Sequence, residues 1–317
     1  MQIKKRSTGS GAALLILLIL GIVAGFCMAA VWTGLQQAEP LLRLPHRPAG
    51  TKGDADLPAG PAVQTPLKLT EADLASVSVR YASDCSYRPN LAALLDSPLP
   101  WNLTGNAPTV LIVHSHGTES FTKEPGQAYT ESSEFRTLDT GYNMVALGDQ
   151  LALLLRQRGI EVIHDRQLHD YPSYGSAYDN SRNSVQAILQ QYPTIQVVLD
   201  LHRDAVLNSD GSQYAPTVLL DGQQAAKLML VVGTDASGLE HSGWEENMAA
   251  AVKLQAALER IAPGVTRPTI LRAQRFNHDL SPGALIVEVG TAGNTFQQAQ
   301  LVLPVLADGL ALLMNGT

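Results

Sequence analysis

An apolar run of strand length passes directly into two histidines and a glutamate in Val110-Leu111-Ile112-Val113-His114-Ser115-His116-Gly117-Thr118-Glu119-Ser120. In open α/β sheets, the carboxyl ends of the strands form the edge at which ligands bind. His116 and Glu119 place an imidazole nitrogen and a carboxylate oxygen, both good zinc ligands, close together in sequence. The stretch therefore predicts two ligands of a metal site at the edge of a sheet, and a third ligand must come from elsewhere.

After Pro108, apolar runs of strand length alternate with apolar residues at helical spacing. The strand-like runs cover 160–164, 195–201 and 285–289, and the helical stripes cover 144–155, 185–189, 244–258 and 295–314. This alternation is typical of an α/β fold with a mostly parallel sheet that is covered by helices on both faces. Two more strands, at 217–220 and 228–232, are expected to form a hairpin around Asp221-Gly222.

The N-terminal part of the chain predicts a membrane anchor. Residues 11–33 carry no charged side chain, and as a helix they are long enough to cross a bilayer. A basic stretch at residues 4–6 precedes them, so the positive-inside rule places residues 1–10 in the cytoplasm and the rest of the chain outside. A cleaved signal peptide is the alternative, because residues 28–30 are Met-Ala-Ala; the length of the apolar run favours a retained, single-pass anchor.

Two segments separate the anchor from the regular part of the chain. Residues 34–69 are rich in Pro, Ala and Gly and predict a flexible linker, and residues 70–106 form a membrane-proximal segment. Residues 107–317 are then the catalytic domain. The net charge of −7 argues against a nucleic-acid partner, which requires a basic face. With only two cysteines, one of them in the apolar run, no structural disulfide or cysteine-based zinc site is indicated.

Three of the predicted strands carry polar residues that a buried strand has no packing reason to keep. They are His114, His116 and Glu119; Asp200, His202, Arg203 and Asp204; and Glu288. A catalytic zinc site uses three protein ligands and leaves a fourth position to water, so His116, Glu119 and His202 are the candidate ligands. Glu288 is the candidate general base, because its apolar neighbours should raise its pKa towards the working range.

His114 is a second candidate catalytic residue. It lies two residues before His116, and on a continuous strand the two side chains share a face. His114 is therefore either an alternative metal ligand or a group that orients one. The histidines in expected loops or at the ends of elements, His241 above all, are expected to be solvated or substrate-facing polar residues.

His202 and Glu288 also have purely structural interpretations, as members of buried ion pairs. The alternative partners are Asp200 or Asp204 for the histidine, and Arg272 or Arg275 for the glutamate.

Six blocks of sequence, in a fixed order, go beyond generic zinc chemistry. They cover residues 114–120, 169–174, 200–204, 232–235, 277–282 and 288–290. With these blocks, the chain from about Pro108 onward resembles stage II sporulation protein P, a family of membrane-anchored cell-wall hydrolases of endospore-forming bacteria. It departs from the family pattern at His278, where glutamine is usual, and in Tyr174-Gly175-Ser176, where an asparagine is expected.

The resemblance implies a zinc-dependent fold similar to the N-acetylmuramoyl-L-alanine amidases, which cut the amide between muramic acid and the stem peptide of peptidoglycan. It also implies endopeptidase action on peptide cross-links. By position, His116 and His202 match the family's metal histidines, Glu119 its carboxylate ligand and Glu288 its catalytic glutamate. The implied setting is engulfment during sporulation, in the forespore-facing space between two membranes. The implied partner is the lytic transglycosylase stage II sporulation protein D.

Two other functions fit the same residues. A catalytically inactive module of this fold would bind the cell wall or a partner without cleaving it. A zinc carboxypeptidase-like enzyme shares the order of the ligands and needs a cation for a terminal carboxylate, for which Arg203, Arg272 or Arg275 is available.

Overall fold

The structure is a computed structural model that describes residues 68–313. The predicted cytoplasmic N-terminus, the anchor at residues 11–33 and nearly all of the linker lie outside these residues. Within residues 68–313, no helix is both long and apolar enough to span a membrane.

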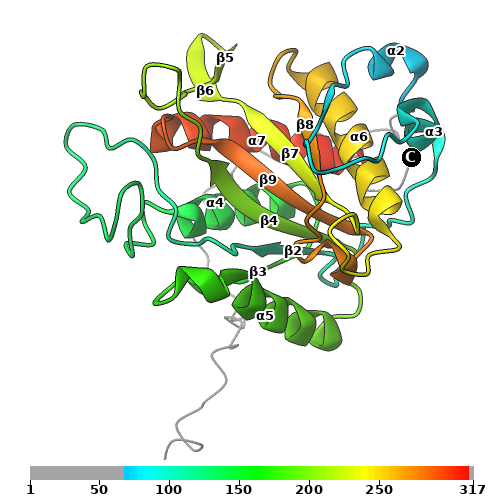
Figure 1. Cartoon of the computed structure of the whole chain (residues 1–317), viewed down its shortest axis with the longest axis horizontal. Helices are drawn as coiled ribbons and strands as arrows, with labels where there is room; N and C mark the ends of the chain where they lie inside the picture. Colours follow the sequence, from blue (N-terminus) through cyan, green and yellow to red (C-terminus); the bar gives the residue numbers. More distant parts are fainter. Residues whose placement is uncertain (1–67, 314–317) are drawn as a thin grey trace, which may run out of the picture. The chain divides into compact units, whose positions relative to one another are not determined.

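Seven strands form one sheet in the order β1-β8-β7-β9-β4-β2-β3 (Figure 1). Their bounds are β1 Val79–Tyr81, β2 Val110–Val113, β3 Val162–His164, β4 Val197–Asp204, β7 Leu228–Gly233, β8 Thr269–Arg272 and β9 Gly283–Thr291. All neighbouring strands run parallel except β7 and β9. The predicted α/β fold with a mostly parallel sheet is confirmed.

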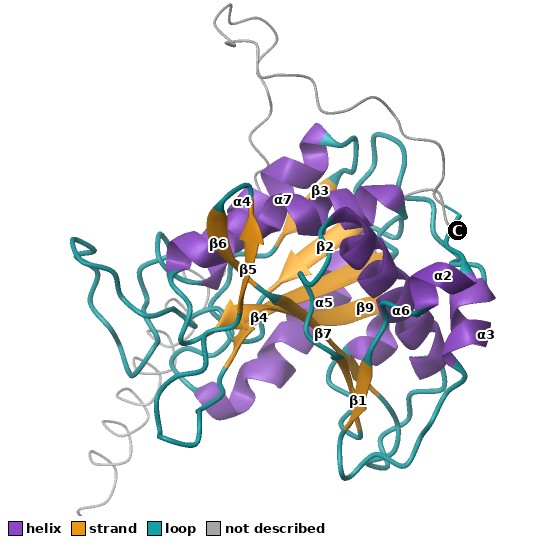
Figure 2. Ribbon diagram, turned by 90° about the horizontal axis from the view of Figure 1, so that it is seen from above, coloured by secondary structure: helices purple, strands orange, loops and turns teal. Residues whose placement is uncertain are grey.

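Helices pack on both faces of this sheet (Figure 2). The long helices are α4 Met144–Gln157, α5 Ala177–Gln191, α6 Trp244–Ile261 and α7 Phe296–Leu312. The apolar faces of α4, α6 and α7 join the larger core on one face of the sheet. On the other face, Val185 and Ile188 of α5 pack against residues of β2, β3 and β4.

Helix α5 covers only part of its face of the sheet. Four side chains of β7, β8 and β9 form a separate apolar cluster beyond it: Met229, Val231, Ile270 and Ile286. These side chains line a cavity of about 300 Å³, here termed the open-face cavity. The uncovered part of the sheet is therefore the floor of a cavity.

Residues 70–106 belong to the same sheet and core as the rest of the described chain. β1 pairs with β8 as the edge strand, and α3 (Leu91–Asp96) buries Leu95 in the larger core. The short helix α2 (Glu71–Leu74) precedes β1. The sequence separates residues 70–106 from a catalytic domain at 107–317, whereas the structure joins the two.

The hairpin around Asp221-Gly222 is present, but its second strand differs from the expected one. β5 (Thr217–Leu220) pairs with β6 (Gln223–Ala226), and residues 228–233 instead form β7 of the main sheet. Asp221 and Gly222 have φ of 48° and 80°, as a two-residue hairpin turn requires. This tight turn pairs β5 with the residues that follow at once and leaves the next apolar run free for the sheet.

Candidate metal centre

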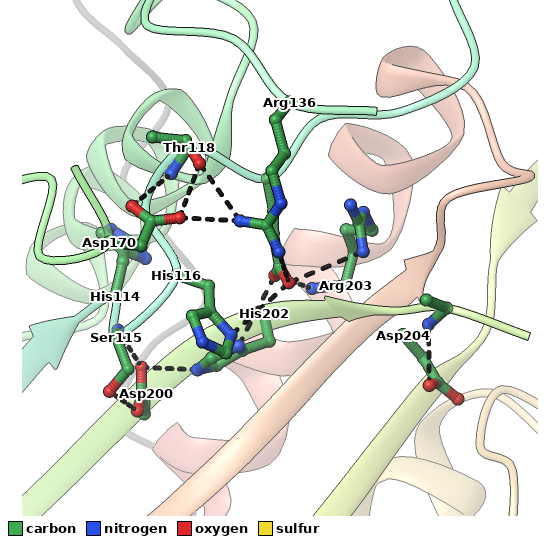
Figure 3. Close-up of polar contacts among 12 residues, drawn as sticks. His114, Ser115, His116, Thr118, Arg136, Asp170, Asp200, His202, Arg203 and Asp204 are labelled. Carbon is green, nitrogen blue, oxygen red and sulfur yellow. Dashed lines mark hydrogen bonds and ion pairs between the residues drawn. The ribbon is translucent and has the colours of Figure 1, made fainter. Parts of the chain in front are cut away.

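The three predicted ligands meet at one point beside the sheet. Figure 3 shows the two histidines of this group, His116 and His202, with their rings side by side. The Nδ1 atoms of His116 and His202 lie 3.6 and 3.5 Å from the two carboxylate oxygens of Glu119. One ligand atom from each of the three residues lies within 4.8 Å of the others. Tetrahedral zinc with bonds of about 2.1 Å holds its ligand atoms about 3.4 Å apart. Two nitrogens and one oxygen at these separations fit a zinc ion with an open position.

The chain brings His116 to this point because β2 ends at Val113. Beyond it, a turn carries His116 to the α5 side of the sheet, where its ring stacks on Tyr174 at 4.5 Å between centroids. The ring also meets His202 of β4 edge-on, at 5.0 Å. Aromatic packing therefore holds the His116 ring in place without a metal.

Asp200 holds the other histidine of the cluster. Its carboxylate lies 2.9 Å from His202 Nε2 and accepts a hydrogen bond from the Ser115 backbone N–H at 2.7 Å. Burial lowers the pKa of His202, but the charge of Asp200 and its hydrogen bond outweigh burial and raise this pKa well above its ordinary value. The predicted structural alternative, an ion pair of His202 with Asp200, is therefore present, and it is compatible with the place of His202 among the three candidate ligands. Because Asp200 contacts Nε2 of the His202 ring, Nδ1 of the same ring points towards Glu119. Carboxylates orient metal-bound histidines in the same way.

Two arginines fix the carboxylate of the cluster. Glu119 accepts a hydrogen bond from the Arg203 backbone N–H at 3.2 Å, and the guanidiniums of Arg203 and Arg136 each lie 3.5 Å from it. Burial raises the pKa of Glu119, but the charge of Arg203 and the contacts with His202 outweigh burial and lower this pKa to about 2. Arg136 is held in turn by Asp170, at 2.7 Å. Arg136 could not be predicted from the sequence, because it is one arginine in the long loop between β2 and α4 and follows no strand or motif.

Glu288 lines the open-face cavity together with the three clustered residues. In the register of β4 and β9, it lies opposite His202. Its Oε2 is buried and accepts no hydrogen bond from any residue between 68 and 313, and the alternative partners Arg272 and Arg275 form no ion pair with it. Burial raises the pKa of Glu288 to about 8, although the charge of His202 opposes this.

His114 lies apart from the cluster. It is fully buried beside α4, with Nε2 2.8 Å from His164 Nε2 and Nδ1 3.2 Å from the Leu201 carbonyl oxygen. The expectation that His114 and His116 share a face is wrong, because the strand ends before either residue. Burial lowers the pKa of His114 to about 3, which keeps its ring neutral.

His241 is not solvated. Its side chain is buried, as is that of His278, and both residues line a second cavity. His241 lies in the loop before α6 and His278 in the loop after β8, and Arg275 of the second loop donates a hydrogen bond to the Glu240 carbonyl oxygen of the first, at 3.3 Å.

The family model for stage II sporulation protein P matches residues 62–311. The chain belongs to this family. It is 26% identical over 220 residues to stage II sporulation protein P of Bacillus subtilis, a match that covers 66% of the chain and 52% of the relative. The chain therefore spans about half the length of this curated relative.

Two solved structures are similar to the chain at low sequence identity. The N-acetylmuramyl-L-alanine amidase Ami1 of Mycobacterium smegmatis has a TM-score of 0.40 at 13% identity, with 66% of the chain and 97% of the amidase covered. The N-acetylmuramoyl-L-alanine amidase AmiC2 of Nostoc punctiforme has a TM-score of 0.39 at 11% identity, with 65% and 97% covered.

Proposed function

We propose that this member of the stage II sporulation protein P family is a zinc-dependent N-acetylmuramoyl-L-alanine amidase that cleaves peptidoglycan. One observation carries the proposal: His116, Glu119 and His202 meet with metal-ligand geometry beside Glu288, whose Oε2 is buried, and all four residues line one cavity. A wall-binding module without catalysis has no need of a buried, unpaired carboxylate at this position. Membership of the stage II sporulation protein P family also supports peptidoglycan as the substrate.

His116, Glu119 and His202 are the groups that would hold the zinc. When bound, the metal supplies Lewis-acid polarisation of the substrate carbonyl and a water of lowered pKa. Glu288 Oε2 accepts a proton from the attacking water and then donates it to the leaving amine nitrogen. Burial raises the pKa of this carboxyl group above its ordinary value, which favours its protonated form after the first step, so one group is able to serve in both steps. Asp200 keeps the His202 ring in its orientation throughout.

The cellular setting is part of the proposal. Residues 11–33 anchor the chain in the membrane by a single pass, and the catalytic part acts outside the cytoplasm, on peptidoglycan in the forespore-facing intermembrane space. Endopeptidase action on cross-links and a partnership with stage II sporulation protein D are further parts of it, which rest on family resemblance.

The carboxypeptidase-like alternative is less well supported. Arg203 is buried and hydrogen-bonds the carbonyl oxygens of Ser120 and Phe135, and Arg275 pairs with Asp279 at 3.3 Å. These two arginines are thus already engaged. Arg272 does line the open-face cavity, but it lies on β8, separated from Glu288 by β7.

Metal content and reaction products test the proposal together. The purified protein should bind one zinc per chain and release stem peptides with a free alanine amino group from N-acetylmuramoyl peptides, and it should leave the same peptides uncut when they lack the muramoyl group. Chelation should stop the reaction, and added zinc should restore it. One bound zinc without cleavage would favour the binding module, and removal of C-terminal residues from free peptides would favour the carboxypeptidase.

A further inference from the structure

Two arginines line the open-face cavity far from the metal ligands. Arg80 lies on β1 and Arg272 on β8, the two strands at the edge of the sheet most distant from β4 along this face. Both side chains are exposed. Neither forms an ion pair with any residue that the structure describes, and Arg272 Nε only donates a hydrogen bond to the Gln274 side chain, at 3.3 Å.

The register of the strands fixes how far these cations lie from the reaction site. Arg80 lies opposite Ile270, and Ile270 opposite Val231, in one row across the sheet. This row meets β9 at Ile286, two residues or about 7 Å along the strand from Glu288, and three strand spacings of about 4.8 Å separate β9 from β1. Arg80 therefore lies about 16 Å from Glu288 across the sheet. An extended peptide covers about 3.4 Å per residue, so about five residues span this distance.

The charge of the lining side chains differs between the two ends of the cavity, and its middle is apolar. Its carboxylates, Glu119, Asp204 and Glu288, lie at the metal end, and the free arginines lie at the other. Apolar side chains of β7, β8 and β9 form the floor between the two ends, and Phe276 packs against them. A ligand that complements this cavity is extended, apolar along one side and anionic at a point away from the cleaved bond.

We propose that Arg80 and Arg272 bind a carboxylate of the stem peptide, within about five residues of the scissile amide. The proposal rests on the amidase function and names the part of the substrate that the cavity selects. A guanidinium binds a carboxylate through paired hydrogen bonds, which makes arginine better suited to this task than lysine. The membrane-proximal segment thereby supplies a specificity-determining residue, because β1 carries Arg80 into the cavity.

The test compares two soluble substrates of the full-length, zinc-loaded protein. One is an N-acetylmuramoyl tripeptide with free carboxylates, and the other is the same tripeptide with those groups converted to carboxamides. The wild type should prefer the free acid by at least about tenfold in kcat/KM, where tenfold corresponds to about 1.4 kcal/mol. Arg80→Gln and Arg272→Gln should each raise KM for the free acid several-fold with little change in kcat, and the double variant should have a preference near one.

Arg166→Gln is the matched control, because Arg166 is an exposed arginine that does not line the cavity. It should retain the wild-type preference, and thermal unfolding should show that all variants are folded. Equal use of both substrates by the wild type would overturn the proposal, and so would an equal loss on both substrates in the arginine variants.

A binding measurement separates this inference from the amidase function. The free tripeptide product, titrated calorimetrically, should bind the wild type at least about tenfold more tightly than the double variant. This difference without any cleavage would contradict the amidase and support the carboxylate site. Cleavage with equal product binding would support the amidase and contradict the carboxylate site.

Discussion

Glu288 is the side chain on which cleavage should depend most strongly. The substitution Glu288→Gln keeps the size of the side chain but removes the carboxyl group that is proposed to move the proton. We expect kcat to fall by about 10²- to 10⁴-fold, with zinc content and the melting temperature of the zinc-loaded protein little changed. Turnover of a soluble muropeptide, measured beside metal analysis, checks this. Glu131→Gln, at an exposed position, should behave as the wild type. Retained cleavage by Glu288→Gln would exclude this residue as the base.

The same residue predicts how the stability of the metal-free protein changes with pH. The pKa of Glu288 is about 8 in the folded chain, against an ordinary value of 4.5. Between these values the folded state keeps a proton that the unfolded chain has released. The contribution to stability is therefore complete below pH 4.5 and is lost as the pH rises to about 8, at a total cost of less than about 5 kcal/mol.

Urea unfolding of the metal-free protein at several pH values measures this loss. Between pH 5 and pH 8, the free energy of unfolding should fall more for the wild type than for Glu288→Gln, which has no proton to release at this position. Parallel curves for the two proteins would mean that Glu288 ionises normally.

Asp200 should tune the metal site without binding the metal. Asp200→Asn weakens the contact that directs His202 Nδ1 towards Glu119. We expect the zinc affinity to fall by about 10- to 100-fold, measured by competition with a chelating dye. Asp149→Asn is the matched control, because Asp149 contacts His164, a histidine outside the cluster, at 3.0 Å. An equal loss of affinity in both variants would point to a general effect of charge.

The residues of the candidate site could be predicted from the sequence because each one follows or interrupts a recognisable apolar strand. His116, Glu119, His202 and Glu288 all reach one cavity for this reason. His114 could not be placed in the same way. Its predicted orientation assumed that the strand continues, and the length of a four-residue strand depends on tertiary contacts that no local pattern contains.

At the level of elements, α4 packs unusually closely on the strands beneath it. Gly148 faces the Nε2 atoms of His114 and His164, which leave no room for a β-carbon. Gly148→Ala should therefore destabilise the protein by about 1–3 kcal/mol, measured by urea unfolding. Gly175→Ala is the control: a β-carbon there meets nothing within 4 Å, so its effect should be small.

Predictions about β-strands were less complete than predictions about helices. β1 and β8 are only three and four residues long, and neither has a distinctive pattern. β7 has a strong apolar pattern, but it pairs with β8 and β9 and not with β5, the partner that the sequence predicts. The residues between the Asp221-Gly222 turn and β7, Gln223–Ala226, form the second strand of the hairpin. Two glutamines at the start of this segment hide it from a search for apolar strands. Strand order across a sheet is set by packing and cannot be derived from such short segments.

For the molecule as a whole, the predicted linker should limit where the enzyme acts. Residues 34–69 are expected to be flexible and to span several tens of ångströms. Deletion of half of this segment should reduce cleavage of intact cell walls, measured by release of soluble fragments, and leave turnover of a soluble muropeptide unchanged. A glycine-serine segment of the original length should restore wall cleavage. If turnover of the soluble substrate fell equally, the linker would instead act on the catalytic part itself.

β1 and the short helix α2 before it lie, along the chain, between the predicted linker, which would tether the enzyme, and the open-face cavity. This strand is held to the sheet by three residue pairs with β8, and it is the first strand after the linker. A pull along the tether, as when two membranes move past the wall, would load this short edge strand before the deeper strands that carry Glu288 and His202. Mechanical force would thus weaken peptide binding by Arg80 before it disturbed the metal ligands. An enzyme under tension would release its substrate and keep its metal site folded for the next reaction.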